Sequence, residues 1–172
     1  MGRMLRPFRG QMPRVHPTAY IDQSAQVIGD VEIGAESSVW PAVVIRGDVN
    51  RIRIGNRSNV QDGTIVHVMK DTHATIVGDN VTIGHGAVIH GCTIENVCLI
   101  GMGAILLNGV RVGACSIVAA GTLLVEGASV PPRSLVMGSP GKVKRALNDE
   151  EVAEIQQYAD RYVSYRLDYQ TT

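Results

Sequence analysis

The 172-residue sequence is poor in aromatic residues and cysteine, and it carries no net charge. Aromatic residues make up only 4% of the chain although hydrophobic residues reach 45%, which excludes a core built on large rings. A neutral chain offers no basic surface that could follow a phosphate backbone, so we expect no nucleic-acid partner. No apolar run approaches the roughly twenty residues of a membrane-spanning helix, so we expect no membrane association. The N-terminus lacks the apolar stretch of a secretory signal, and the few cysteines form no close pairs, which predicts a cytoplasmic protein with reduced thiols.

Aliphatic residues recur in the sequence with a period of six. The runs are Ile21, Val27, Ile33, Val39 and Ile45, then Ile54, Val60 and Val66, then Ile83 and Ile89, and finally Ile94 and Ile100. This period fits neither an α-helix nor a flat strand, and it is typical of hexapeptide repeats that form a parallel β-helix. Three hexapeptides make one triangular coil of about 18 residues, so the span 15–136 supplies about seven coils.

The repeat stops after Val130, and residues 136–142 are interpreted as an irregular crossing. A helix is predicted next, because Asn148 can cap it and Ile155, Tyr158, Tyr162, Tyr165 and Tyr169 step along one helical face. We predict an all-β fold, with a parallel β-helix and crossing segment in residues 1–145. A C-terminal α-helix in residues 146–172 packs on it, and the whole forms a single domain.

The repeat is interrupted at residues 46–51 and again at residues 69–73. Insertions in a solenoid usually collect on one face, which is often the functional one. We therefore expect both segments to lie on the same side of the molecule, near any functional site.

Three histidines occupy positions that suggest a catalytic metal site. His67 follows the repeat aliphatic Val66, and His90 follows Ile89, 23 residues further on. That separation equals one coil of about 18 residues plus the five residues 69–73, so both rings should stack on one face. His85 lies across a corner, and a threefold trimer would bring it to the other two. Three imidazoles with a fourth position open are the pattern of a catalytic zinc site; the alternative is that they are exposed histidines bonded to water.

These motifs resemble the γ-class carbonic anhydrases and their close relatives in the hexapeptide-repeat superfamily. The resemblance rests on residues 45–48, 59–62, His67 and residues 83–92, and it covers nearly the whole chain. It implies left-handed β-helices assembled as a homotrimer, with a metal between subunits held by His67, His85 and His90. The implied ion is Zn²⁺, with Fe²⁺ as an alternative in the cell. The implied reaction is a lyase reaction, the hydration of carbon dioxide to bicarbonate by metal-bound hydroxide.

The resemblance also implies roles for five further residues. Gln61 would lie beside the metal and hydrogen-bond the bound water or the substrate. Arg46, Asp48 and Asp62 would form an ion-pair network across the subunit interface near the site, or serve only to hold that interface. Tyr162 would reach towards the site from the C-terminal helix.

The chain departs from the archaeal prototype of this family at the expected proton shuttle. Val49 stands where the prototype has a glutamate, and residues 69–73 replace a longer acidic loop. His73 either substitutes for the shuttle, because histidine is the side chain suited to proton transfer near neutral pH, or is a simple loop residue.

Two other classes of function stay open. Residues 138–142 resemble the closing segment of hexapeptide-repeat acyltransferases, although those enzymes typically need one general-base histidine rather than three ligands. A metal-dependent thioesterase or accessory protein on the same scaffold is the other alternative. Cys92, Cys98 and Cys115 are predicted to be buried, inert thiols.

Overall fold

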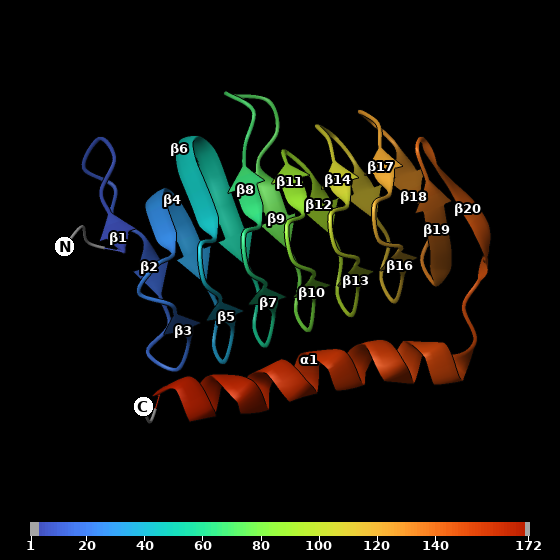
Figure 1. Cartoon of the computed structure of the whole chain (residues 1–172). Helices are drawn as coiled ribbons and strands as arrows, with labels where there is room; N and C mark the ends of the chain where they lie inside the picture. The colour runs from blue at the N-terminus through green and yellow to red at the C-terminus, as the bar shows by residue number, and fades with distance from the viewer. Residues whose placement is uncertain (1–3, 171–172) are drawn as a thin grey trace.

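A computed structural model describes residues 4–170, which form a three-sided parallel β-helix with one long helix lying along it (Figure 1). The first face contains β1 (Leu5–Arg6), β8 (Ile65–His67), β11 (Val88–His90), β14 (Ile105–Leu106) and β17 (Leu123–Leu124). The second face contains β2 (Arg14–Val15), β9 (Thr75–Val77), β12 (Thr93–Ile94), β15 (Arg111–Val112) and β18 (Ser129–Val130). Two longer strands, β4 (Gln26–Ile33) and β6 (Val44–Ile54), run round the corner and belong to both faces.

The third face forms a separate sheet that crosses every coil. Its strands are β3 (Tyr20–Ile21), β5 (Ser38–Val39), β7 (Asn59–Val60), β10 (Thr82–Ile83), β13 (Leu99–Ile100), β16 (Ile117–Val118), β19 (Ser134–Gly138) and β20 (Gly141–Ala146). Seven of these eight strands pair in parallel, one per coil, which confirms the predicted solenoid of about seven turns.

The core consists of aliphatic columns, because each face turns one residue per coil inward. On the first face Ile45, Val66, Ile89 and Leu106 pair in register, and all four are fully buried. Each such side chain contributes about 1.5–3 kcal/mol of hydrophobic stabilisation. A single coil cannot bury its own aliphatic side chains. Because these side chains recur every six residues, they are buried only when successive coils stack in register.

The corner between the first and second faces is sharp at β4 and β6 because glycines allow close backbone approach. Gly29 has a φ of +80°, and a Cβ at Gly47 would lie 2.6 Å from the carbonyl oxygen of Asp30. The segment 46–51 interrupts the repeat as expected, although it lies within strand β6: Gly29 pairs with Gly47 and Val31 with Ile52, so four residues of β6 stand opposite one residue of β4.

The C-terminal part closes the solenoid and returns along it. The expected irregular crossing is an antiparallel hairpin of β19 and β20. Helix α1 (Asp149–Gln170) then begins with a reciprocal cap, in which Asn148 Oδ1 accepts from the Glu151 N–H and the Glu151 carboxylate accepts from the Asn148 N–H. It runs back to the first coils, where Arg166 donates to the carbonyl of Thr18 at 2.9 Å.

The buried face of α1 differs from the predicted tyrosine stripe. Ile155, Ala159 and Arg166 are its buried residues, whereas Tyr165 and Tyr169 are about half exposed. The aromatic rings lie at the edge of the contact, where Tyr162 and Tyr169 pack against Trp40. No helix among residues 4–170 is long and apolar enough to cross a membrane.

The cysteines follow the prediction except at one position. Cys92 and Cys98 are buried, and burial raises the pKa of each thiol to about 12, which keeps both thiols protonated and unreactive. Cys115 is only partly buried.

Candidate metal centre

His67 and His90 stack on neighbouring coils of the first face, as the spacing predicted. They end β8 and β11 and pair directly in the strand register. The Nδ1 atom of His67 lies 3.1 Å from the Nε2 atom of His90. Two nitrogens bound to one tetrahedral zinc at 2.0–2.1 Å lie about 3.3 Å apart, so the pair is spaced as two ligands of one ion would be.

The outward nitrogens of both rings are held by acceptor groups. The Nε2 atom of His67 lies 3.0 Å from a carboxylate oxygen of Asp48, and a carboxylate can only accept, so this nitrogen carries the proton. The Nδ1 atom of His90 lies 2.8 Å from Oδ1 of Asn108. The amide nitrogen of Asn108 donates to Glu126 at 2.9 Å, which fixes the orientation of the amide and makes Nδ1 of His90 a donor as well.

The inward nitrogens must then both present lone pairs to each other. Such a contact is repulsive unless a proton or a cation lies between the two atoms. Burial, assisted by the nearby charge of Arg46, lowers the pKa of His67 although Asp48 opposes this, and the shift disfavours a shared proton. The donor set therefore fits a metal cation, with outer hydrogen bonds of the kind that orient metal-bound histidines.

Asn108 and Glu126 were missed by the sequence analysis, although a signal was present. Asn108 lies 18 residues after His90, which is one coil, and Glu126 lies one coil further. A polar residue one coil after a candidate ligand is therefore a candidate for the outer hydrogen bond.

Asp48 joins the histidine pair to Arg46. Arg46 forms an ion pair with the second oxygen of Asp48. Burial of Asp48 would raise its pKa, but the hydrogen bonds from His67 and Arg46 lower it overall, so the group is a carboxylate at neutral pH. Within one chain Asp62 lies apart from this cluster, 2.9 Å from Nδ1 of His85, so its role in an ion-pair network across the subunit interface stays a prediction.

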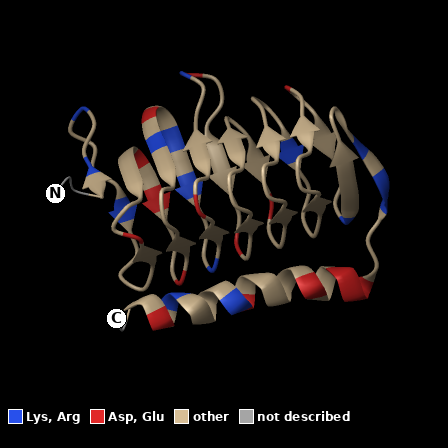
Figure 2. Ribbon diagram, viewed as in Figure 1, with Lys and Arg blue, Asp and Glu red and all other residues tan. Residues whose placement is uncertain are grey.

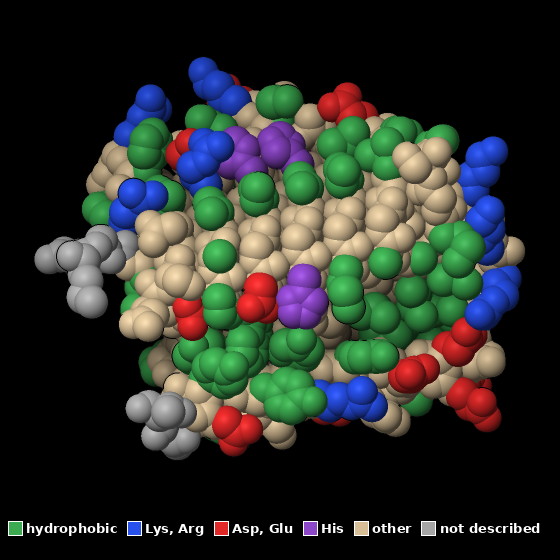
Figure 3. Space-filling view, viewed as in Figure 1, with side chains coloured by type: hydrophobic (Ala, Val, Ile, Leu, Met, Phe, Trp, Pro, Cys, Tyr) green, Lys and Arg blue, Asp and Glu red, His purple; other side chains and the backbone are tan. Residues whose placement is uncertain are grey.

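His85 lies apart from the other two histidines, at the corner between β10 and β11. Among residues 4–170 no group of three or more His, Cys, Asp or Glu side chains is arranged to hold a metal. Figure 3 likewise shows two touching histidine side chains and a third that is separate from them on the same side of the molecule. One chain thus supplies a pair of candidate ligands and a single one elsewhere.

Gln61 and Tyr162 border the same cavity as His85. This cavity of about 370 Å³ lies between the third face and α1, and its walls are mostly aliphatic. Gln61 is buried and donates to Asn59 Oδ1 at 3.1 Å. Burial, with smaller contributions from Asp62 and Tyr165, raises the pKa of Tyr162, so its phenol is protonated at neutral pH and can act as a hydrogen-bond donor.

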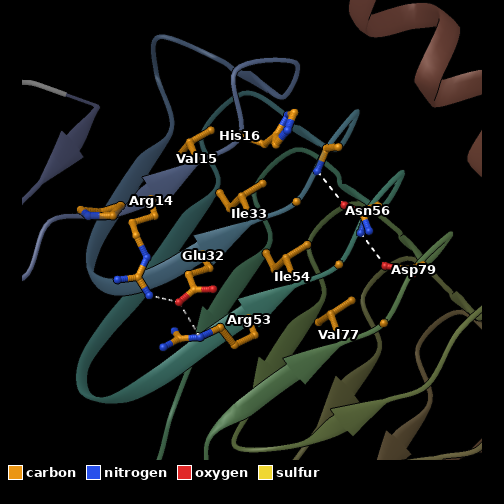
Figure 4. Close-up of a pocket in the computed structure, with 15 residues that line it drawn as sticks. Arg14, Val15, His16, Glu32, Ile33, Arg53, Ile54, Asn56, Val77 and Asp79 are labelled. Carbon is orange, nitrogen blue, oxygen red and sulfur yellow. Dashed lines mark hydrogen bonds and ion pairs between the residues drawn. The ribbon is translucent and has the colours of Figure 1, made fainter.

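A wider hollow of about 720 Å³ lies on the second face, away from the three histidines (Figure 4). Glu32 in this hollow is paired with both Arg14 and Arg53. Asp79 also lines the hollow, so the lining carries two basic and two acidic side chains and its charges cancel. The hollow therefore offers little to a charged ligand and we assign it no function.

Together these features define a hexapeptide-repeat β-helix protein with a candidate metal-binding histidine pair. The chain is 52% identical over 143 residues to "Probable carbonic anhydrase" of Methanocaldococcus jannaschii, which covers 83% of this chain and 89% of that one. It is 46% identical over 157 residues to "Gamma carbonic anhydrase 2, mitochondrial" of Arabidopsis thaliana, which covers 88% of this chain. The chain thus belongs to the γ-class carbonic anhydrase-like family of hexapeptide-repeat proteins.

The plant relative is much longer than this chain, which spans 56% of its length. Among solved structures, a hexapeptide transferase family protein from Anaplasma phagocytophilum has a TM-score of 0.92 at 39% identity, covering 96% of this chain and 97% of that one. No protein-family model matches the chain.

Proposed function

We propose that this protein is a metal-dependent carbonic anhydrase of the γ class that interconverts carbon dioxide and bicarbonate. The observation that carries the proposal is the His67–His90 pair, whose two facing lone pairs fit a cation. The relatives named as carbonic anhydrases supply the reaction. Zn²⁺ suits an imidazole site, and Fe²⁺ is the alternative, because affinity alone does not decide which metal is bound in a cell.

We propose that a second copy of the chain supplies His85 as the third ligand within a homotrimer. An outward-facing aliphatic column on the first face supports this arrangement. Ile65 and Ile105 are 48% and 38% exposed, and Val88 stands between them in register. An apolar stripe of this kind beside charged residues is typical of a surface that another protein covers.

The side chains around this site have separate tasks in the proposed reaction. When bound, a divalent cation would supply the nucleophile, because it lowers the pKa of water from 15.7 to about 7. Asp48 and Asn108 orient the two rings. The carboxamide oxygen of Gln61 is available to accept a hydrogen bond from water, since its nitrogen already donates to Asn59. The aliphatic cavity suits apolar carbon dioxide, and the protonated Tyr162 can donate to a bicarbonate oxygen.

The second candidate function is acyl transfer. It is favoured by the 39% identity to a structure described as a hexapeptide transferase. That reaction would need no paired ligands, so it leaves the fixed ring orientations of His67 and His90 without a purpose. The predicted thioesterase or accessory role would use the same metal and differs only in substrate.

The test combines metal analysis with assembly. His67→Ala, His85→Ala and His90→Ala should each lose the metal, and the metallated parent should hydrate carbon dioxide in a stopped-flow indicator assay. Mixed trimers of His67→Ala and His85→Ala subunits should regain one intact site each, because the two remaining ligand sets meet at one interface. No metal in any mixed trimer would refute the shared site. A fully metallated parent with background hydration would refute the carbonic anhydrase and leave another substrate on the same site.

A further inference from the structure

Three segments that depart from the repeat meet at one pocket. They are the N-terminal hairpin around Phe8 and Gln11, the bend of β6 at residues 47–51, and the loop between β8 and β9. All three lie at the corner between the first and second faces, and both basic and acidic segments lie at or near their tips (Figure 2). They enclose a polar pocket of about 330 Å³.

The walls of this pocket are tied together. The side-chain amide of Asn50 donates to the carbonyl of Met69 at 3.1 Å, which joins the β6 bend to the β8–β9 loop. Phe8 and Gln11 exchange two backbone hydrogen bonds of 2.9 Å, which close the hairpin. The hairpin packs closely on the corner, since a Cβ at Gly29 would lie 3.3 Å from Cβ of Phe8. The pocket is therefore preformed, which lowers the entropic cost of binding.

Three basic and three acidic side chains line the pocket, but two of the carboxylates are already paired with groups outside it. Asp30 is paired with Arg53 at 2.8 Å, and Asp48 with His67 and Arg46. The remaining lining charges are those of Arg9, Arg51, Lys70 and Asp71.

None of these three cations forms an ion pair with a carboxylate of residues 4–170. Most arginines elsewhere in the described chain do form one. With Asp71 as the single unpaired carboxylate, the pocket presents an excess of positive charge.

We propose that this pocket binds a small oxyanion of the bicarbonate and phosphate class, held by Arg51 and Lys70 with Arg9 at the rim. Guanidinium groups bind the oxygens of such anions in a forked geometry, and an ammonium group adds a compact charge. The pocket is large enough for one such anion with several waters. Asp48, which is hydrogen-bonded to His67, also lines the pocket, so an anion here would lie beside the candidate metal site. The bicarbonate source rests on the proposed function; a phosphate source does not.

The test is isothermal titration of the full-length protein with inorganic phosphate and, separately, with bicarbonate at constant ionic strength. Saturable binding should weaken about tenfold in Arg51→Gln and in Lys70→Gln, because each loses one charge-assisted contact. Lys144→Gln, an exposed lysine on β20 far from the pocket in sequence, should bind like the parent. Melting curves of all variants should coincide. Binding of both anions supports a pocket that accepts bicarbonate, the product of the proposed reaction. Binding of phosphate alone supports a pocket whose ligand carries a phosphate group.

The metal itself must be excluded as the binding partner. His85→Ala, which should lack the metal, is expected to bind phosphate with the affinity of the parent. Loss of phosphate binding in this variant would overturn the pocket, as would a parent that binds neither anion saturably. Equal weakening in Lys144→Gln would reduce the effect to overall charge and would also overturn it. Hydration activity does not enter any of these outcomes, so a failure of the carbonic anhydrase proposal would be seen separately.

Discussion

Replacing Asn108 by alanine should weaken metal binding without touching a proposed ligand. In the parent, Oδ1 of Asn108 accepts from Nδ1 of His90 at 2.8 Å, and Glu126 fixes the amide orientation at 2.9 Å. With the acceptor gone, the proton of a neutral His90 is free to move to Nε2. That is the nitrogen that faces His67, so a metal would have to displace the proton before binding.

The expected size of the effect follows from comparable outer hydrogen bonds. Their removal typically lowers metal affinity by 10–100-fold, which corresponds to about 1.4–2.7 kcal/mol. An ordinary hydrogen bond contributes only about 0.5–1.5 kcal/mol to folding, so the loss of stability should be smaller than the loss of metal affinity. Glu126→Ala should give a weaker effect of the same sign, because the amide then only gains the freedom to flip.

The measurement is a competition titration for Zn²⁺ against a chromophoric chelator at neutral pH, with chemical unfolding of the metal-free protein as the control. Asn108→Asp keeps an acceptor for His90 and should retain more affinity than the alanine variant. A Zn²⁺ dissociation constant for Asn108→Ala within twofold of the parent value would contradict the proposal that Asn108 supports metal binding by fixing the tautomer of His90. Equal losses in affinity and in metal-free stability would reduce Asn108 to a structural residue.

Three further predictions concern the fold and the proton path. Hydrogen bonds from Arg145 and from the Asn148 backbone lower the pKa of Glu151 from 4.5 to about 2, so its contribution to stability is present above pH 4.5 and is lost as the pH falls towards about 2. The melting temperature of Glu151→Gln should thus be lower than that of the parent at pH 7 and equal to it near pH 2. A difference in melting temperature that persists at pH 2 would contradict this. Ile100→Ala, at a fully buried position, should cost about 2–5 kcal/mol in urea unfolding, and a loss below 1 kcal/mol would be inconsistent with a close-packed column. If His73 carries the proton, His73→Ala should slow turnover with metal content intact and be rescued by imidazole; unchanged turnover would leave it a loop residue.

Much of the fold could be predicted because each coil repeats the same physical requirement. An aliphatic every sixth residue is sufficient to give the three columns, and the register of Val66 with Ile89 follows from counting. The ends of the solenoid could not be predicted in this way. Strand β1 and the hairpin of β19 and β20 form by pairing with strands already in place, and a segment that pairs at an edge needs no periodic sequence.

The helix shows why helical spacing alone was insufficient. The tyrosines from 158 to 169 satisfy the period, yet the buried positions include Ala159 and Arg166. The small side chain of Ala159 lets the helix approach the sheet. Arg166 is buried because Glu36 and the carbonyl of Thr18 accept its hydrogen bonds, 130 and 148 residues away in sequence. Only the tertiary structure supplies those acceptors. Helical periodicity alone therefore assigned the buried face of α1 to the tyrosines and missed Arg166.

The same counting that placed His67 opposite His90 also accounts for His85. A residue five positions before His90 lies on the far side of a corner, and no slip of the register within one chain can bring it back, because each slip would also move Ile89 out of the core. Retaining the aliphatic columns therefore keeps His85 separate from the pair. A three-histidine site and a well-packed core are compatible in this sequence only if the third imidazole comes from another copy, which is why we expect metal binding and assembly to be lost together.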